Sequence, residues 1–328
     1  MRALTFAALT LASAQVCAAP AYDLYLKPQT LATLPDGRKV NFLCMGEGAP
    51  VAIIEQGWGG VAFQWRHVQP EMAKITKTCY FERPGYGFSD PGPMPRDSAA
   101  DVRDLHDGLK AAGLRPPFVL SSASLGGFNI RLYAYTYPNE VAGLEIQDPP
   151  AEQFYVQNPE PDEDVDDLRR CIALAKVRPL VDGGPEHCID DTHFGPEWTP
   201  DIKTQTFAYA SKPPFMETLL SEDISMVTMS TKEIIAARRP LGRIPIVLLQ
   251  ADTDCDWKGR TPKTDGDRFD VLRCAALADQ VKDSTRGERR IVGGSGHSVY
   301  DDRPDVVIAT FREIVEAARR LKVTAADK

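Results

Sequence analysis

Short apolar runs alternate along this chain with stretches of helical periodicity, and this alternation limits its fold more than any other feature. The apolar runs predict strands at Val51 to Glu55, Cys79 to Glu82, Phe118 to Ser121, Val141 to Ile146, Ile244 to Gln250 and Arg289 to Val292. Helical spacing predicts helices over 98–112, 125–137 and 305–321. Alternating strands and helices indicate an α/β fold, with a mostly parallel sheet covered on both faces.

Turn and capping residues predict a hairpin and the two ends of one helix. Two runs at 31–34 and 39–44 flank Asp36-Gly37, a dipeptide typical of a tight turn, and predict a hairpin before the first parallel strand. The helix over 98–112 is expected to begin at a capping pair, Ser98 with Asp101, and to end at Gly113.

One segment interrupts the alternation. Residues 149–240 are polar, acidic and rich in proline, with several helix-like pieces. We interpret them as a cap inserted into a core formed by residues 20–148 and 241–328. Large apolar side chains of this segment are expected mostly in the core of the cap, with an apolar substrate pocket as the alternative: Trp198, Phe207, Tyr209, Phe215, Met216, Met226 and Met229.

The N-terminus has the order of a secretory signal. Arg2 precedes an apolar run from Ala3 to Ala14, and small residues follow, so residues 1–19 are expected to be cleaved near Ala18 or Ala19. The run is shorter than the roughly 20 residues that span a bilayer. The protein is therefore expected in the periplasm or outside the cell, where the six cysteines left after loss of Cys17 would form disulfides.

The net charge of the chain limits the kinds of molecule that it is expected to bind. The formal net charge is −8, whereas nucleic-acid binding needs a basic face. No second apolar stretch is long enough to anchor the chain in a membrane. We expect a small-molecule substrate, and the oligomeric state stays open.

A serine follows the strand at 118–121 and precedes a helix. A nucleophile on a sharp strand-to-helix turn needs small residues two positions before and after it. Ser124 meets this rule with Ser122 and Gly126, whereas Ser122 and Ser121 would have Leu120 and Val119 in the crowded position. The N–H of Leu125, at the start of the helix, would be one donor to a developing oxyanion.

A glycine-rich loop, Glu55-Gln56-Gly57-Trp58-Gly59-Gly60, follows the strand at 51–55. Such a loop can bring a backbone N–H beside the nucleophile, and Trp58 is the candidate second donor, with Gly57 giving the loop its freedom.

A histidine and several acids follow the last two strands. His297 lies in the glycine-rich stretch Gly293 to Ser298, where it could reach a serine on a neighbouring strand. Asp252, Asp254 and Asp256 follow the strand at 244–250, and a carboxylate there can hold the histidine tautomer. Asp254 is the first choice, and Asp148, after the preceding strand, is the alternative.

The order Ser124, Asp254, His297, each after a strand, resembles the α/β-hydrolase family from Lys39 to Leu321. The run Arg83 to Asp90 and the Gly296-His297-Ser298 stretch resemble its esterase and aminopeptidase-like members. Gln56 stands where histidine is common, and Ser122 where glycine is common. The resemblance implies a Cys44–Cys79 disulfide between neighbouring antiparallel strands. Cys171–Cys188, within the cap, and Cys255–Cys274, by sequence proximity, are further expected pairs.

The resemblance implies ester hydrolysis through a Ser-His-Asp triad and an acyl-enzyme, without a cofactor. An aminopeptidase of the same fold, or a catalytically silent binding protein, are the alternatives. Epoxide and haloalkane hydrolases are disfavoured because they carry aspartate where this chain has Ser124. The stretch His187 to His193 could bind a metal, but its spacing matches no standard site.

Overall fold

The computed structural model describes residues 22–157, 164–181, 183–185, 187–189, 197–253, 255–256 and 260–326. The predicted signal peptide lies outside them. Among these residues, no helix is both long and apolar enough to cross a membrane.

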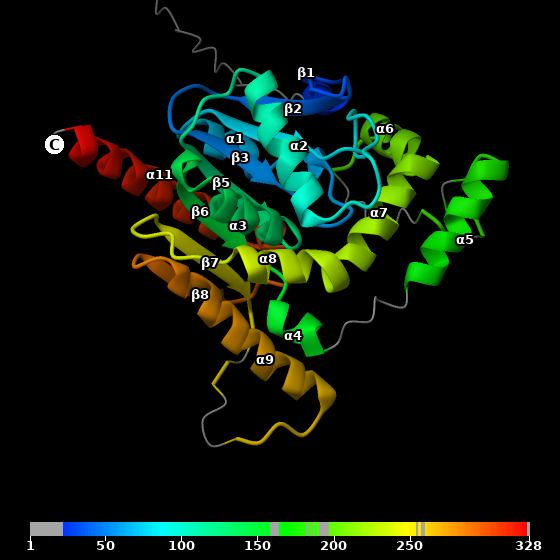
Figure 1. Ribbon diagram of the computed structural model, residues 1–328. Helices are drawn as coiled ribbons and strands as arrows, with labels where there is room; N and C mark the ends of the chain where they lie inside the picture. The colour runs from blue at the N-terminus through cyan, green and yellow to red at the C-terminus, as the bar shows by residue number, and fades with distance from the viewer. Residues whose placement is uncertain are drawn as a thin grey trace, which may run out of the picture.

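The centre of the molecule is a sheet in the order β1-β2-β4-β3-β5-β6-β7-β8 (Figure 1). The strands are β1 Thr30–Thr33, β2 Lys39–Met45, β3 Val51–Glu55, β4 Thr78–Glu82, β5 Phe118–Ala123, β6 Val141–Gln147, β7 Ile246–Ala251 and β8 Gly287–Val292. Strands β3 to β8 are parallel, whereas β2 is antiparallel to both β1 and β4. The expected α/β class is therefore confirmed.

Helices cover both faces of this sheet. The described helices, including those of the segment between β6 and β7, are α1 Gln69–Ala73, α2 Ser98–Ala111, α3 Gly126–Thr136, α4 Glu152–Gln157, α5 Asp164–Val177, α6 Pro200–Ala210, α7 Pro213–Ser225, α8 Thr231–Ala237, α9 Asp265–Gln280, α10 Val299–Asp302 and α11 Pro304–Ala326. Short 3₁₀ turns lie at Tyr22–Tyr25, Ala62–Trp65, Pro138–Glu140 and Val281–Asp283, and a π turn at Met226–Ser230.

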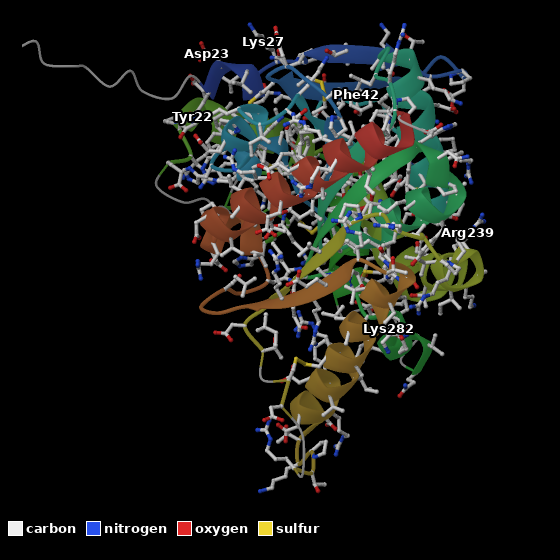
Figure 2. The ribbon with its side chains drawn as sticks, turned by 90° about the vertical axis from the view of Figure 1, so that its left-hand side faces the viewer. Tyr22, Asp23, Lys27, Phe42, Arg239 and Lys282 are labelled. Atoms are coloured by element: carbon white, nitrogen blue, oxygen red, sulfur yellow. A yellow bond between two sulfur atoms is a disulfide. The ribbon has the colours of Figure 1, made fainter. Side chains whose placement is uncertain are left out.

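Alternate residues of the central strands feed two separate cores. Ile53 belongs to the cluster under α2 and α3, and its neighbour Ile54 to the cluster under α11, because successive side chains of a strand point to opposite faces. Figure 1 shows α2, α3 and α8 on one face, and Figure 2, turned by 90°, shows α11 crossing the other.

Two local predictions need correction. The N-cap of α2 is Asp97, whose side chain accepts a hydrogen bond from the Ala100 N–H, so Ser98 is already the first helical residue. Strand β7 begins at Ile246 rather than at Ile244, and Pro245 explains the difference, because proline has no N–H to donate to a sheet.

The segment between β6 and β7 contains α4 to α8. We use the name cap segment for residues 149–240, whose role as an inserted cap stays a prediction. It has a small apolar cluster of its own that includes Leu180, Phe215 and Met216, and the cluster continues onto Tyr86 of the core. Helix α8 returns to the core and packs against α3.

Three disulfides join the cysteine pairs expected from the sequence. Cys44 and Cys79 lie directly opposite each other on antiparallel β2 and β4. Cys171 pairs with Cys188 in the cap segment, and Cys255 pairs with Cys274 of α9.

Candidate active site

Ser124 lies on a sharp turn between β5 and α3. Its φ is +49°, a left-handed conformation that costs a non-glycine residue energy and that must be held by its surroundings. Ser122 and Gly126 flank the turn as the rule for small residues requires. A Cβ added at Gly126 would lie 2.2 Å from the Glu55 carbonyl oxygen, which explains why only glycine fits there.

The glycine-rich loop after β3 lies directly against this turn. A Cβ on Gly57 would be 3.0 Å from the Ser124 Cβ, so the loop backbone approaches the serine as closely as packing allows. Within the part of the chain that the structure describes, no acceptor is recorded for the N–H groups of Trp58 and Leu125. Leu125 directly follows Ser124, and Trp58 directly follows Gly57, the residue that lies against Ser124.

Gln56 braces the loop from the other side. Its side chain accepts a hydrogen bond from the Trp65 indole N–H at 2.6 Å and donates one to Gln64 at 2.9 Å. The residue that replaces the common histidine thus has a structural role in shaping the loop.

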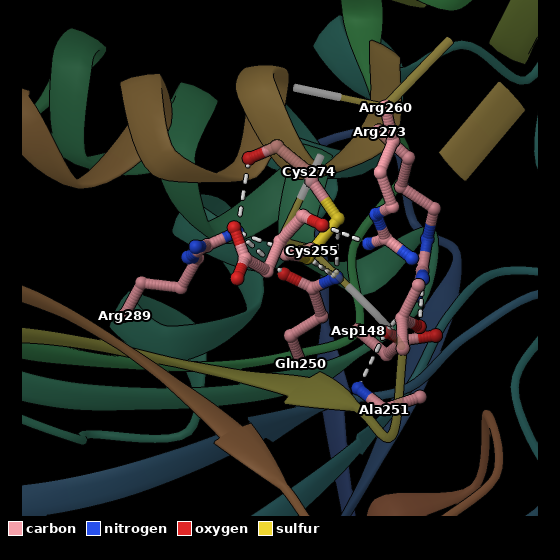
Figure 3. Close-up of a disulfide and its surroundings, with 10 residues drawn as sticks. Asp148, Gln250, Ala251, Cys255, Arg260, Arg273, Cys274 and Arg289 are labelled. Carbon is pink, nitrogen blue, oxygen red and sulfur yellow. Dashed lines mark hydrogen bonds and ion pairs between the residues drawn. A yellow bond between two sulfur atoms is a disulfide. The ribbon is translucent and has the colours of Figure 1, made fainter. Parts of the chain in front are cut away.

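His297 meets a carboxylate from β6. Its Nδ1 lies 2.6 Å from Oδ2 of Asp148, which is 3% exposed and follows the last residue of the strand. The other oxygen, Oδ1, accepts the Ala251 N–H at 2.9 Å and pairs with the guanidinium of Arg273 (Figure 3). Asp148 itself has a φ of +42°. A buried carboxylate held in this way can fix the tautomer of the imidazole and stabilise its protonated form.

The acid that contacts His297 in the structure is Asp148, the alternative from the sequence, and the first choice stays a prediction. Asp254 lies outside the described residues. Asp252 accepts a hydrogen bond from the Gly294 N–H at 2.8 Å, so it holds the loop before His297. Asp256 receives a contact to its carbonyl oxygen from Arg260.

One cavity of about 500 Å³ joins these residues. Ser124, Asp148 and His297 all line it, and the His297 side chain is 61% exposed, so a substrate can reach it. Most of the remaining wall is apolar: Trp58, Pro149, Pro150, Ala151, Phe154, Tyr155, Met226, Ala251 and Phe269. Arg273 and Asp223 complete it.

Sequence reasoning missed part of this wall. Phe154 of α4 packs edge-on against Phe269 of α9, with ring centroids 4.8 Å apart, and neither was singled out. Arg273 was missed as well. Of the apolar cap residues that were named, Met226 lines the cavity, whereas Trp198, Phe215 and Met216 are buried in the cores. No local pattern marks such residues, because α4 and α9 meet only in the folded chain.

The alternative metal stretch, His187 to His193, lies partly outside the described residues. Its Cys188 is bonded to Cys171, which removes a thiolate ligand. Among the residues described, no cluster of three or more histidine, cysteine or acidic side chains is arranged to hold a metal ion.

A family model described as the alpha/beta hydrolase family matches residues 56–310, a range that contains Ser124, Asp148 and His297. The chain belongs to this family. An alpha/beta hydrolase of this architecture carries its reactive residues at the carboxyl ends of the strands, where the cavity lies.

Solved structures similar to this alpha/beta hydrolase cover most of its length. An esterase from Thermogutta terrifontis is 19% identical, covering 89% of this chain and 99% of its own, with a TM-score of 0.59. The epoxide hydrolase CorEH is 16% identical, covering 87% and 97%, with a TM-score of 0.62. At this identity the likeness shows the fold.

The curated relatives are matched over shorter stretches. YbdG of Bacillus subtilis is 27% identical over 123 residues, which are 37% of this chain and 38% of YbdG. YqjL of the same species is 25% identical over 104 residues, 32% of this chain and 41% of YqjL. The matches thus span about two-fifths of the length of these relatives.

Proposed function

We propose that this alpha/beta hydrolase cleaves a carboxylic ester through an acyl-enzyme on Ser124. The observation that carries the proposal is the 2.6 Å contact between His297 Nδ1 and Asp148 Oδ2. Because Nδ1 contacts the buried acid, Nε2 is the ring nitrogen left to exchange a proton with the Ser124 hydroxyl. Ser124 and His297 line the same cavity.

The mechanism assigns one role to each residue. His297 Nε2 takes the proton of the Ser124 hydroxyl as Oγ attacks the ester carbonyl carbon, and Asp148 stabilises the imidazolium. The N–H groups of Trp58 and Leu125 stabilise the oxyanion, each by about 3 kcal/mol. His297 then protonates the leaving alkoxide. Water, activated by the same imidazole, hydrolyses the acyl-enzyme.

Two features favour an ester over an epoxide. Epoxide hydrolases of this fold use an aspartate at the bend, and this chain has Ser124 there. The wall is largely apolar, which suits an ester with a hydrophobic acyl or alcohol part.

Export is part of the proposal. Three disulfides are typical of proteins that leave the reducing cytosol. Together with the signal-like order of residues 1–19, they support a periplasmic or secreted enzyme.

Ser124→Ala tests the proposed nucleophile. We expect wild type to hydrolyse a nitrophenyl ester and to be labelled by a fluorophosphonate, and the variant to lose both with an unchanged circular dichroism spectrum. Ser122→Ala is the matched control, since it removes the neighbouring hydroxyl and keeps a small residue at the bend. Turnover that persists in Ser124→Ala would refute the assignment.

An aminopeptidase remains the second candidate because Asp223, 5% exposed, lines the same cavity. Its carboxylate could meet a substrate ammonium group. Turnover of an aminoacyl anilide that exceeds turnover of the ester, and that falls in Asp223→Asn, would favour this alternative.

A further inference from the structure

We propose that Arg83 is the positioning residue of the oxyanion loop, and that Glu222 of the cap segment holds it in place. The inference rests on the proposed function. It adds that the oxyanion donor at Trp58 depends on how helix α7 docks on the core.

The guanidinium of Arg83 binds two successive carbonyl groups of the loop. Its Nη2 donates to the Gly57 oxygen at 2.9 Å, and its Nη1 donates to the Gln56 oxygen. Nη1 also lies 3.1 Å from a carboxylate oxygen of Glu55. Arg83 is 2% exposed, so these contacts are shielded from water.

The geometry of the peptide bond between Gly57 and Trp58 relates these contacts to the direction of the Trp58 N–H. In a trans peptide, the C=O of one residue and the N–H of the next point in opposite directions. Because Arg83 holds the Gly57 oxygen on its own side, the Trp58 N–H points away from Arg83. Gly57 also lies close to Ser124, since a Cβ added to it would be 3.0 Å from the Ser124 Cβ. The direction of the donor is therefore set by the guanidinium.

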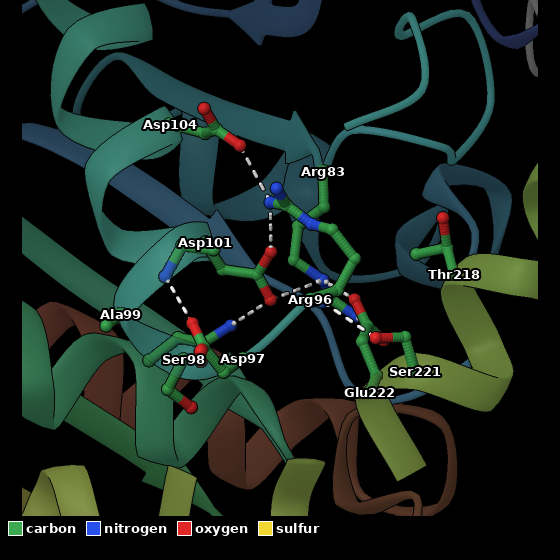
Figure 4. Close-up of polar contacts among 12 residues, drawn as sticks. Arg83, Arg96, Asp97, Ser98, Ala99, Asp101, Asp104, Thr218, Ser221 and Glu222 are labelled. Atoms are coloured by element: carbon green, nitrogen blue, oxygen red, sulfur yellow. Dashed lines mark hydrogen bonds and ion pairs between the residues drawn. The ribbon is translucent and has the colours of Figure 1, made fainter. Parts of the chain in front are cut away.

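Glu222 of α7 fixes the guanidinium in turn. Its two carboxylate oxygens accept from Arg83 Nε at 2.8 Å and from Nη2 at 3.1 Å, a bidentate pair that restricts rotation of the planar group (Figure 4). Tyr86 adds a bridge, because its hydroxyl donates to Glu222 at 2.6 Å and accepts from the Gly59 N–H at 3.1 Å.

A third link joins the same two elements. The indole N–H of Trp58 donates to the Leu219 carbonyl of α7 at 2.8 Å. The loop is thus tied to one cap helix by its side chain at Trp58, by its backbone at Gly59 and, through Arg83, by its carbonyl groups.

Arg83 keeps its charge in this buried position. Burial alone would lower its pKa, but the nearby Glu222, Tyr86, Glu55 and Asp101 raise the pKa well above its ordinary value. Figure 4 shows the surrounding acids, with Arg96 pairing Asp101 and Asp104 beside it. A permanently charged, planar donor in a buried site is well suited to hold backbone oxygens rigidly.

The first test is Arg83→Lys, which keeps the charge that the buried acids require and removes the planar fork. We expect kcat for a nitrophenyl ester to fall by about 10- to 100-fold and KM to change by less than about threefold, because a misplaced donor weakens the transition state rather than substrate binding. The inhibition constant of a trifluoromethyl ketone, whose adduct carries an oxyanion, should rise by a similar factor.

Glu222→Gln and Tyr86→Phe decide the question if the lysine variant does not fold. Both variants leave Arg83 charged but remove a contact that holds it in place. We therefore expect kcat to fall by on the order of fivefold and the inhibition constant of the trifluoromethyl ketone to rise by a similar factor. Arg238→Lys is the control. Arg238 pairs with Asp279 and Asp283, none of which lines the cavity, so this variant should lose thermal stability without changing kcat or the ketone constant.

Two results would overturn the inference while leaving the proposed function standing. One is wild-type kcat and ketone affinity in all three variants, and the other is a rise in KM alone. A wild-type protein that neither turns over an ester nor is labelled at Ser124 would overturn both the proposed function and the inference.

Discussion

Two non-glycine residues of the site have left-handed backbone, and they lie at the ends of neighbouring strands. Ser124 follows β5 and Asp148 follows β6. The Ser124 N–H donates to the Gln147 oxygen at 2.8 Å, and the Asp148 N–H donates to the Leu249 oxygen at 2.7 Å. The ladder of the sheet thus continues into both bends and offsets their conformational cost.

Asp148→Asn separates the two aspartates that the sequence left open. An amide cannot stabilise an imidazolium and favours the wrong tautomer, so we expect kcat to fall by about 10⁴-fold. Asp254→Asn should leave kcat within about threefold of wild type. Both variants can be assayed on one nitrophenyl ester.

A large loss of kcat in Asp254→Asn with little change in Asp148→Asn would instead identify Asp254 as the acid that supports His297. An unchanged circular dichroism spectrum checks that each variant is folded, and fluorophosphonate labelling of Ser124 should slow in parallel with kcat, because it needs the same activated serine.

Helix α9 connects a disulfide to the candidate active site. Cys274 is bonded to Cys255 in the loop after β7, and the preceding residue, Arg273, pairs with Asp148 (Figure 3). Arg273 also donates to the Thr253 hydroxyl at 2.9 Å. The disulfide therefore holds the turn of helix whose arginine contacts Asp148.

A double substitution, Cys255→Ser with Cys274→Ser, should lower both stability and activity. The bridged residues are 19 apart in sequence, and closing such a loop stabilises a fold by about 3 kcal/mol. We expect kcat to fall about fivefold or more, because Arg273 loses its anchor beside Asp148.

Cys171→Ser with Cys188→Ser is the matched comparison, since those residues are 17 apart and close a loop of similar size. It should lose similar stability by thermal unfolding and keep kcat. Equal losses of kcat in the two double variants would argue against a link from α9 to the site.

Buried acids couple the stability of the whole molecule to pH. Burial raises the pKa of Glu145 to about 8, although the Ser121 hydroxyl donates to it at 2.7 Å. Burial likewise raises the pKa of Glu55 and of Glu82 to about 7. Each of these carboxyl groups therefore keeps its proton to a higher pH in the folded chain than in the unfolded chain, where its pKa is near the ordinary value of 4.5. The unfolded chain therefore binds fewer protons, and the free energy of unfolding falls as the pH rises from about 4.5 to 8.

Glu145→Gln tests this coupling, because glutamine has a similar shape and does not titrate. Relative to wild type, we expect a melting temperature that is similar at pH 5 and higher by on the order of 10 °C at pH 9. A difference that stays constant with pH would contradict the assignment. Glu288→Gln serves as control: hydrogen bonding from Arg290 lowers the pKa of Glu288, so its difference should not rise across this range.

The sequence by itself determined the layered α/β core and two of the candidate reactive positions. The strands follow from short apolar runs, and the bend at Ser124 follows from a steric rule that depends only on its neighbours at 122 and 126. His297 follows from its place in a glycine-rich stretch after the last strand. These are local properties of the chain, so a local pattern suffices to predict them.

Only the tertiary structure decided which acid meets His297 and what surrounds the cavity. Strands β6 and β7 are neighbours in the sheet, so their carboxyl ends lie at one edge, and an aspartate after either strand satisfies the same pattern. The choice depends on the path of each loop. The ion pair between Arg83 and Glu222 joins residues 139 positions apart, and sequence spacing over such a separation carries no information about contact.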